Sequence, residues 1–328
     1  MGKRYLVTGG AGFIGSAMIK KLIKDPGNII ANVDKLTYAS NLESLSSVKD
    51  NDNYSFFNCD ICDFNKLKEI IINFRPEIII NFAAESHVDK SIFASKEFIN
   101  SNIYGTYNLL EICRELCEKK EIIFHHISTD EVYGDIEGKP PSVETDSYKP
   151  SSPYSSSKAA SDHLVKAWHR TYKLPVFITN CSNNYGPYQH KEKLIPKVIT
   201  NILNNKDIPV YGNGEQTRDW IFVEDHISGI LKVLESGEIG ETYNLGGSNE
   251  IRNIDLIHRI IELINKINNG NEINLDKMRS LITYVEDRLG HDKRYAINSK
   301  KAELIGWSIK DSFEINLEKT IKWYMNEV

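Results

Sequence analysis

The first half of the chain alternates short apolar runs with longer amphipathic stretches. The runs cover residues 4–8, 29–33, 54–57, 78–81, 122–124 and 176–179. Runs that are apolar almost throughout are typical of strands buried on both faces, as happens when helices cover both sides of a parallel sheet. The alternation therefore predicts an α/β fold with a doubly wound parallel sheet.

The amphipathic stretches predict the helices between these strands. Helical patterns cover residues 13–24, 64–74, 95–119 and 153–172. In the last of these, Pro153 stands in the first turn, where its missing N–H costs nothing, and Ser151 and Ser152 are candidate N-caps. We therefore expect a regular helix to begin at about residue 153.

The pattern loosens after about residue 182, where Gly, Asn and Pro become frequent. One amphipathic helix follows, with a single apolar face made of Ile254, Ile257, Ile260, Ile261 and Ile264. A chain of 328 residues also exceeds the size at which one core keeps growing. We expect a larger domain from residues 1–182 with about 219–246, and a smaller C-terminal α/β domain from 183–218 and 247–328.

Composition and charge exclude several classes of protein. The chain is 41% hydrophobic and 26% charged, which is ordinary for a globular enzyme, and its net charge of −5 leaves no basic face for nucleic acid. No stretch approaches the roughly 18 apolar residues of a membrane span, and no apolar targeting segment precedes the first strand. We expect a cytoplasmic protein with neither a nucleic-acid nor a membrane partner.

The cysteines and histidines give no clear metal site. Five cysteines, at 59, 62, 113, 117 and 181, are an odd number in a long chain, so reduced thiols are expected. His125 and His126 are adjacent in a predicted strand and point to opposite faces, so they cannot chelate one ion together. We expect packing or surface roles for His163, His169, His226 and His258, and no metal.

A glycine-rich turn follows the first predicted strand and opens the first predicted helix. Gly9, Gly10, Gly12 and Gly15 satisfy G-x-G-x-x-G, in which backbone N–H groups approach a pyrophosphate at a helix N-terminus. Asp34 ends the second strand, where a carboxylate accepts hydrogen bonds from ribose hydroxyls and repels a 2′-phosphate. The larger domain is therefore predicted to be a Rossmann domain that binds NAD rather than NADP, although Lys35 next to Asp34 could compensate a phosphate.

Tyr154 and Lys158 lie four residues apart on a predicted helix and so share one face. An ammonium beside a phenol favours the phenolate, and a nicotinamide cation would add to that effect, so we expect the pKa of Tyr154 to move down toward neutrality. The alternative is a half-buried aromatic with a solvated lysine. Ser128 and Thr129 end a preceding strand, at the edge where open α/β sheets bind ligands, which favours a catalytic pair.

Together, the glycine-rich turn, Ser128 and Thr129, and the Tyr-x-x-x-Lys spacing resemble the extended short-chain dehydrogenase/reductase superfamily over essentially the whole chain. Within it, residues 129–134 (TDEVYG) resemble the nucleotide-diphosphate-glucose 4,6-dehydratases, above all those that act on dTDP-glucose. Further matching segments are residues 36–42, 83–89, 183–188, 193–196, 218–220 and 287–292.

The resemblance implies dehydration of dTDP-glucose to its 4-keto-6-deoxy product. Tyr154 takes the proton of the carbon 4 hydroxyl while hydride passes to NAD, Glu131 removes the hydrogen at carbon 5, and protonated Asp130 helps the carbon 6 hydroxyl to leave. Hydride then returns to carbon 6, so NAD is recycled. The two carboxyl groups must differ in protonation state, and the alternative for the Asp-Glu pair is a solvated loop.

Three sets of residues follow from the motifs and the resemblance. The catalytic set is Thr129, Asp130, Glu131, Tyr154 and Lys158. The cofactor set is Gly9, Gly12, Phe13, Ile14, Gly15, Asp34, Lys35, Leu36, Thr37, Asp60, Ile61, Phe82, Ala83, Ala84, Ser101, Tyr154, Lys158 and Asn184. The substrate set is Ser86, Thr129, Asn183, Lys193, Leu194, Pro209, Tyr211, Arg218, Asn253, Arg288 and His291. Arg218 also suits a diphosphate on physical grounds, although an ion pair with Asp219 is the alternative.

Departures from the family pattern are few. Ser40 stands where Gly is usual, Leu289 where Pro is common, and 189–191 (QHK) replaces a more aromatic stretch. A UDP-glucose 4,6-dehydratase, and a 4-epimerase or decarboxylase of the same superfamily, remain alternatives, with Asp130 as the residue that discriminates the last two. A catalytically silent NAD-binding protein is a further alternative. The resemblance also implies a homodimer formed through the helices at 95–119 and 153–172.

Overall fold

A parallel sheet forms the centre of the molecule. The computed structural model describes residues 2–117, 121–268 and 275–327. Within them, seven strands pair in the order β10-β6-β5-β4-β1-β2-β3, all parallel. The strands are β1 (Arg4–Thr8), β2 (Ile29–Asp34), β3 (Tyr54–Asn58), β4 (Ile78–Asn81), β5 (Ile123–Thr129), β6 (Val176–Cys181) and β10 (Thr242–Leu245). The predicted doubly wound sheet is confirmed.

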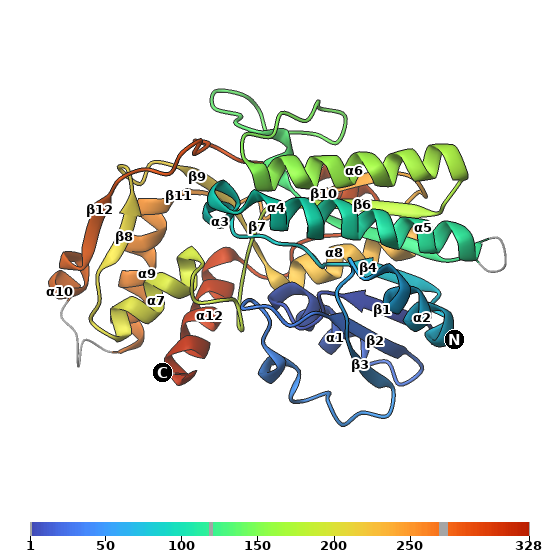
Figure 1. The fold of residues 1–328 in the computed structure, drawn as a ribbon. Helices are drawn as coiled ribbons and strands as arrows, with labels where there is room; N and C mark the ends of the chain where they lie inside the picture. The colour runs from blue at the N-terminus through green and yellow to red at the C-terminus, as the bar shows by residue number, and fades with distance from the viewer. Residues whose placement is uncertain (1, 118–120, 269–274, 328) are drawn as a thin grey trace.

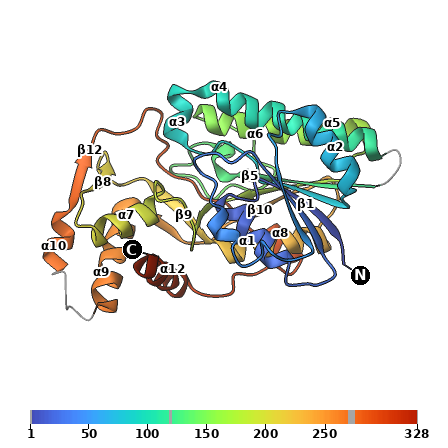
Figure 2. The ribbon, with the colours of Figure 1, turned by 60° about the horizontal axis from the view of Figure 1, so that its bottom comes forward.

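Helices cover both faces of this sheet (Figures 1 and 2). One layer contains α2 (Phe64–Phe74), α5 (Gly105–Cys117) and α6 (Pro153–Tyr172), and the other α1 (Phe13–Leu22) and α8 (Val223–Ser236). Successive strand residues point to opposite layers: Leu6 joins the apolar cluster under α2, α5 and α6, and Val7 joins the cluster under α1 and α8. Burial on both faces explains why these strands are apolar throughout.

The helix α6 begins as the sequence predicts. Ser152 is its N-cap and forms a capping box with Ser155, while Pro153 occupies the first turn. The other candidate cap, Ser151, makes no such bond among the contacts found. The long helix predicted at 95–119 is helical without interruption from Ser95 to Cys117, with a π-helical segment at Ile99–Tyr104 between α4 (Ser95–Phe98) and α5, and residues 118 and 119 lie outside the described part of the chain.

Two strands continue beyond the apolar runs at 122–124 and 176–179, and β5 ends at Thr129, where the sequence predicts its end. β5 runs to Thr129 and β6 to Cys181, although the continuation of β5 is largely polar. His125 and His126 are both buried in β5, where the ring nitrogens meet Thr179 at 3.1 Å and Ser161 at 3.1 Å. Polar side chains with hydrogen-bond partners are tolerated inside a fold, so an apolar pattern underestimates such strands.

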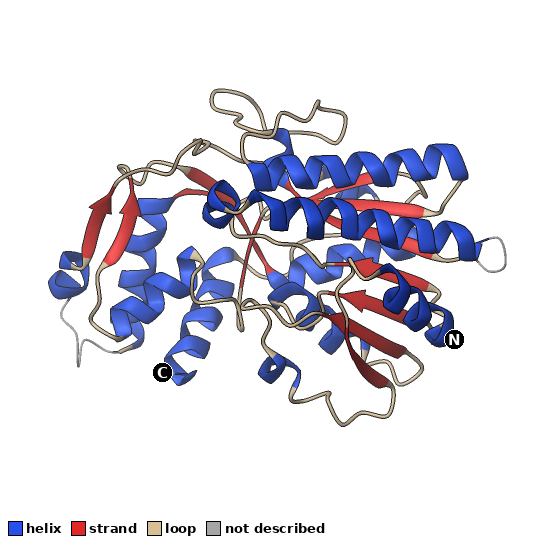
Figure 3. Ribbon diagram, in the orientation of Figure 1, coloured by secondary structure: helices blue, strands red, loops and turns tan. Residues whose placement is uncertain are grey.

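The second half of the chain adds smaller elements beside the carboxyl ends of the large sheet. These are α7 (Leu194–Leu203), α9 (Asn253–Ile267), α10 (Leu275–Ser280), α12 (Phe313–Glu327), a sheet of β7 (Asn183–Tyr185), β9 (Thr217–Phe222) and β11 (Glu250–Arg252), and a pair of β8 (Ile208–Tyr211) with β12 (Ile282–Val285). The pair stands apart from the large sheet in Figure 3. On α9, Ile257, Ile260, Ile261 and Ile264 are buried as predicted, whereas Ile254 is only half-buried.

Candidate active site

A cavity of about 510 Å³ extends along the carboxyl ends of the parallel strands and under the smaller half of the molecule. Every residue of the three predicted sets lines it except Leu36 and Asp130. Leu36 has a left-handed backbone (φ 58°) and a 40% exposed side chain, and what it offers the site is the backbone N–H that it donates to Asp34. Asp130 is discussed below.

The glycine-rich turn brings backbone close to backbone. Gly9 has φ of 65°, and a Cβ there would lie 2.7 Å from the Ala83 nitrogen; at Gly15 it would lie 2.3 Å from the Gly9 carbonyl oxygen. No side chain therefore fits at either position. Gly12 is the N-cap of α1 and supplies no capping side chain, so the first N–H groups of this helix face the cavity and suit an anionic group.

Asp34 is buried and held by three donors. Its Oδ2 accepts from the Ala11 N–H at 3.0 Å, and its Oδ1 accepts from the Leu36 N–H at 2.8 Å and the Ser40 hydroxyl at 2.9 Å. Ser40, a departure from the family pattern, thus adds a hydrogen bond that glycine could not make. The carboxylate is fixed at the end of β2, facing the cavity.

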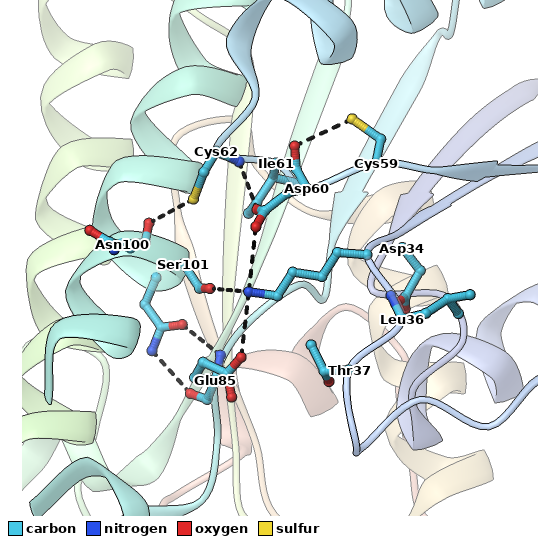
Figure 4. A network of polar contacts seen from close by, with 12 residues as sticks. Asp34, Leu36, Thr37, Cys59, Asp60, Ile61, Cys62, Glu85, Asn100 and Ser101 are labelled. Carbon is cyan, nitrogen blue, oxygen red and sulfur yellow. Dashed lines mark hydrogen bonds and ion pairs between the residues drawn. The ribbon is translucent and has the colours of Figure 1, made fainter. Parts of the chain in front are cut away.

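Lys35 belongs to a polar network with Ser101, Asp60 and Glu85, three residues that Figure 4 labels. Its ammonium donates to the Ser101 hydroxyl at 2.9 Å and pairs with Asp60 at 3.6 Å and Glu85 at 3.5 Å. The Glu85 backbone is held in turn by Asn102. The lysine is therefore already engaged by two carboxylates, which reduces its capacity to compensate a 2′-phosphate.

Tyr154 lies at the end of the cavity nearest β5, packed edge-on against Phe98. Burial and the nearby Glu131 carboxylate raise the pKa of its phenol well above 10.0, while Thr129 acts in the opposite direction through a hydrogen bond. The expectation that this pKa is lowered is therefore wrong for the protein's own side chains. Lys158, which was expected to lower it, donates to the Ile127 carbonyl at 2.7 Å and makes no hydrogen bond to the phenol among those found.

Asp130 is buried and the adjacent Glu131 is half-buried, so the pair does not lie in a solvated loop. Glu131 lines the cavity with Thr129 and Tyr154, whereas Asp130 lies behind them, 2% exposed, and accepts from the Thr129 hydroxyl at 3.3 Å. Its other oxygen, Oδ2, has no partner. The expectation that Asp130 faces the cavity directly is therefore not met, because the short helical turn at Asp130–Tyr133 rotates successive side chains apart.

Burial raises the pKa of both carboxyl groups, but not equally. The pKa of Asp130 lies well above 3.8 because of burial and then the neighbouring charge of Glu131. The pKa of Glu131 is also raised by burial, but Arg218, Lys193 and Arg288 act against that shift. The arrangement favours a protonated Asp130 beside an ionised Glu131, which is the separation that a paired acid and base need.

Basic side chains surround the end of the cavity formed by the smaller half. Arg218 does not pair with Asp219; it donates to the backbone carbonyls of Thr217 and Asp292 at 2.9 and 2.8 Å and stacks over Tyr295. Lys193 donates to the Ser86 carbonyl at 3.1 Å, and Arg288 forms an ion pair with Asp89.

Comparison with known proteins places this site in a family. A family model described as GDP-mannose 4,6 dehydratase matches residues 6–320. The chain belongs to this family. A dTDP-glucose 4,6-dehydratase of Neisseria meningitidis serogroup B is 50% identical over 332 residues, which cover 99% of this chain and 94% of that protein. The resemblance read from the motifs is confirmed.

Solved structures agree with the family assignment. A dTDP-glucose 4,6-dehydratase from Bacillus anthracis in complex with NAD has a TM-score of 0.88 and 41% identity, covering 99% of this chain and 97% of that one. DesIV, the dTDP-glucose 4,6-dehydratase of Streptomyces venezuelae, solved with NAD and dTDP bound, has a TM-score of 0.90 and 39% identity over 98% and 97%.

Several residues around the cavity of this dehydratase-family chain were not predicted as site residues. Among them are Glu85, Asp89, Cys181, Glu192 and Tyr295. Glu85 and Asp89 lie within the matching segment 83–89, so that segment held a signal for them. Tyr295 lies outside all the matching segments, and its contact with Arg218 could be known only from the folded structure.

No metal centre is found among the residues that the structure describes. Cys59, Cys113 and Cys181 are buried free thiols. In the same described part of the chain, no helix is both long and apolar enough to span a bilayer.

Proposed function

We propose that the protein dehydrates dTDP-glucose to dTDP-4-keto-6-deoxyglucose, with NAD as a recycled cofactor. The observation that carries the proposal is that Glu131 lines the cavity beside Tyr154, that Asp130 is buried directly behind this wall, and that the pKa values of the two carboxyl groups are raised unequally. When bound, NAD accepts hydride from carbon 4 of the sugar and returns it to carbon 6.

The catalytic residues divide the remaining proton transfers. Tyr154 takes the proton of the carbon 4 hydroxyl, and Thr129 hydrogen-bonds the same hydroxyl. The resulting ketone acidifies the hydrogen at carbon 5, which the Glu131 carboxylate removes. Asp130, kept neutral by burial, supplies the proton with which the carbon 6 hydroxyl leaves as water. Because Asp130 lies behind the cavity wall, we infer that it acts through the Thr129 hydroxyl that it contacts: this hydroxyl turns to pass its hydrogen to the departing hydroxyl and receives the Asp130 proton in exchange, which leaves Asp130 ionised.

The raised pKa of Tyr154 shows what Lys158 and the cofactor must supply. Burial and Glu131 disfavour the phenolate, so positive charge close to the phenol is needed to bring its pKa down. Lys158, buried in the same wall, provides one such charge. We propose that its ammonium also holds the nicotinamide ribose.

The residues of the cofactor set fit NAD. The glycine-rich turn and the free N-terminus of α1 suit the pyrophosphate, and the fixed Asp34 suits ribose hydroxyls. Lys35, held by Asp60 and Glu85, leaves no free cation to favour a 2′-phosphate at this position. We propose NAD over NADP on this basis.

The substrate set lies in the smaller half of the molecule. We propose that Lys193, Arg218 and Arg288 bind the diphosphate, and that residues 183–218 and 247–328 form the nucleotide-sugar domain. β9 crosses this boundary: it pairs with β7 and β11, whereas β10 belongs to the large sheet and α8 packs against that sheet.

The proposed assembly is a homodimer. α5 and α6 pack together and expose aromatic side chains on one side, with Tyr104 stacked on Tyr107 and both about half-exposed. Tyr172 packs on Trp168 at the end of α6. A second copy covering this surface accounts for the exposed rings, and light scattering at micromolar concentration should give twice the monomer mass. We also propose a cytoplasmic location.

The test is to incubate the purified protein with dTDP-glucose and with UDP-glucose and to identify the products by NMR. A 4-keto-6-deoxy sugar formed faster from dTDP-glucose supports the proposal. Faster turnover of UDP-glucose would move the assignment to a UDP-glucose 4,6-dehydratase. A galactose product or a pentose product would overturn it in favour of an epimerase or a decarboxylase, and NAD binding without turnover would favour a silent binding protein.

A further inference from the structure

Asp162 is a buried carboxyl group that the proposed reaction does not use. It lies on α6 at the eighth position after Tyr154 and the fourth after Lys158, so the three side chains form one column on the helix. Asp162 and Lys158 are 0% and 3% exposed. A carboxyl group so deeply buried is costly unless it has a partner.

The partners of Asp162 come from the strand β5. The Ser128 hydroxyl donates to its Oδ2 at 2.8 Å, and its Oδ1 lies 3.4 Å from Nε2 of His126. That contact is not a hydrogen bond, and Oδ1 has no hydrogen-bond partner among the described residues. The same His126 nitrogen lies 3.3 Å from the Lys158 ammonium, so Asp162 and Lys158 approach one ring nitrogen without forming a direct ion pair among the described residues.

The tautomer of His126 follows from its other contacts. The Asn81 amide directs its NH₂ group to Nδ1 at 3.2 Å, while its carbonyl oxygen accepts from Thr8 at 2.6 Å. Nδ1 is therefore the acceptor and Nε2 carries the proton. Burial, and then the charge of Lys158, lower the pKa of His126 well below 6.5, so the ring is neutral.

This tautomer decides how Lys158 is held. A protonated Nε2 cannot accept from the ammonium, so the lysine donates to the Ile127 carbonyl, and the ring N–H donates to the Ser161 oxygen, with Oδ1 of Asp162 3.4 Å from the same nitrogen. Among the described residues, Asp162 then supplies the negative charge that compensates the buried ammonium. The direction of the lysine pKa agrees: burial lowers it to about 8, and Asp162 opposes that change.

We propose that Asp162 is a positioning residue for the reaction, whose buried carboxylate keeps the Lys158 side chain charged and aligned along the wall that carries Tyr154. The inference rests on the proposed function, in which that ammonium acts on the phenol and the ribose. The titratable groups that act on Lys158 are Asp162 on its own helix, His126 on β5 and Cys181 on β6, while Tyr154 precedes it by one turn of the helix. Those that face Asp162 also include Lys166, Tyr148 and Tyr133.

The test is the titration of Lys158 in protein labelled with ¹³C at the lysine ε carbons, with Lys158→Arg to assign the resonance. In Asp162→Asn the midpoint should fall by about one pH unit or more, because an opposite charge at this range is removed. The alkaline limb of the kcat profile should move to lower pH by the same amount. An unchanged midpoint together with an unchanged profile would overturn the proposal.

A matched control separates this effect from loss of stability. Asp225 is likewise buried, accepts from the Lys310 N–H at 3.1 Å, and lies outside the cavity, so Asp225→Asn should change stability without moving the Lys158 midpoint. If Asp162→Asn does not fold, the unmodified protein still tests the proposal. The chemical shift of its Lys158 resonance should show a second, smaller step near pH 6, where Asp162 takes up a proton. A single step would contradict the proposal.

The NMR titration does not depend on turnover. A protein that shows the lysine shift but leaves dTDP-glucose unchanged would refute the proposed function and preserve the pairing of Asp162 with Lys158. A protein that turns over dTDP-glucose but shows no lysine shift would support the proposed function and refute the role of Asp162.

Discussion

The two ends of the cavity are built differently. At the cofactor end, Asp34 accepts hydrogen bonds from three donors. Lys35 forms ion pairs with carboxylates that are partly exposed to solvent, Asp60 being 39% exposed. At the catalytic end, Asp130, Tyr154 and Lys158 are buried, and one oxygen of Asp130 has no partner at all. The charged groups at the cofactor end already have partners within the protein. The buried groups at the catalytic end carry an electrostatic cost, which bound substrate and cofactor would relieve.

This difference leads to different expectations for mutation. Changes at the cofactor end should produce graded losses of affinity, because exposed ion pairs contribute little each. Changes at the catalytic end should affect turnover far more than binding, because the groups there act on protons that move during the reaction.

The largest effect should come from removing the base or the phenol. Glu131→Gln and Tyr154→Phe should each lower kcat by about 10² to 10⁴, the usual contribution of a positioned acid or base. NAD affinity, measured by calorimetry, should change by less than about threefold in Glu131→Gln, because this carboxylate lies at the catalytic end. Glu241→Gln, which removes an exposed partner of Lys301, is the control. A variant of Glu131 with nearly full turnover would contradict its role.

Asp130→Asn should give the next largest loss, about 10² in kcat, since an amide cannot supply the departing hydroxyl with a proton. Because the pKa of Asp130 is raised well above 3.8, the acid keeps its proton to a higher pH than a free carboxyl group does, and activity that depends on it is lost as the pH rises through that pKa. Quenched-flow analysis of the elimination step should show the loss there and not in the oxidation at carbon 4. Equal loss in both steps would instead indicate a general structural effect.

The buried histidines should make the folded state sensitive to acid. Burial lowers the pKa of His125 and of His226 from 6.5 to about 3, so the unfolded chain binds more protons than the folded one between these values. The free energy of unfolding should therefore fall below pH 6.5 by roughly 1.4 kcal/mol per pH unit for each ring. Urea unfolding at pH 7 and pH 5.5 measures this, and equal midpoints at the two pH values would show that these rings are not buried in the neutral form.

The smallest effect belongs to the cofactor end. Glu85→Gln combined with Asp60→Asn removes both ion-pair partners of Lys35 and frees it for a 2′-phosphate. Two exposed pairs contribute about 1 kcal/mol together, so the preference for NAD over NADP should narrow by roughly fivefold. Adding Lys35→Met to the double variant should restore the preference. The measurement is competition binding with both cofactors. An unchanged ratio of NAD to NADP affinity would show that Lys35 does not contribute to the preference.

Residues whose roles depend on local backbone were predictable from the sequence. Gly9 and Gly15, Asp34 at the end of β2, and the pair Tyr154 and Lys158 are each fixed by spacing within one strand, turn or helix. The fold class could be predicted as well, because each strand and each helix leaves its own local pattern of apolar residues in the sequence.

The features that the sequence did not reveal come from contacts between distant segments. The buried extension of β5 depends on partners such as Thr179 and Ser161, and the direction of the Tyr154 pKa depends on burial that no spacing encodes. Lys35 turns to Glu85, which is fifty positions further along the chain. These interactions exist only once the sheet is assembled.

In the proposed reaction, the sugar is oxidised at carbon 4, loses water, and is reduced at carbon 6, all within one active site. The most direct test is turnover of dTDP-glucose carrying deuterium at carbon 4, with the product analysed by NMR. The account predicts that the deuterium is found at carbon 6 of a 4-keto-6-deoxy sugar. Deuterium retained at carbon 4, or lost to solvent, would contradict it.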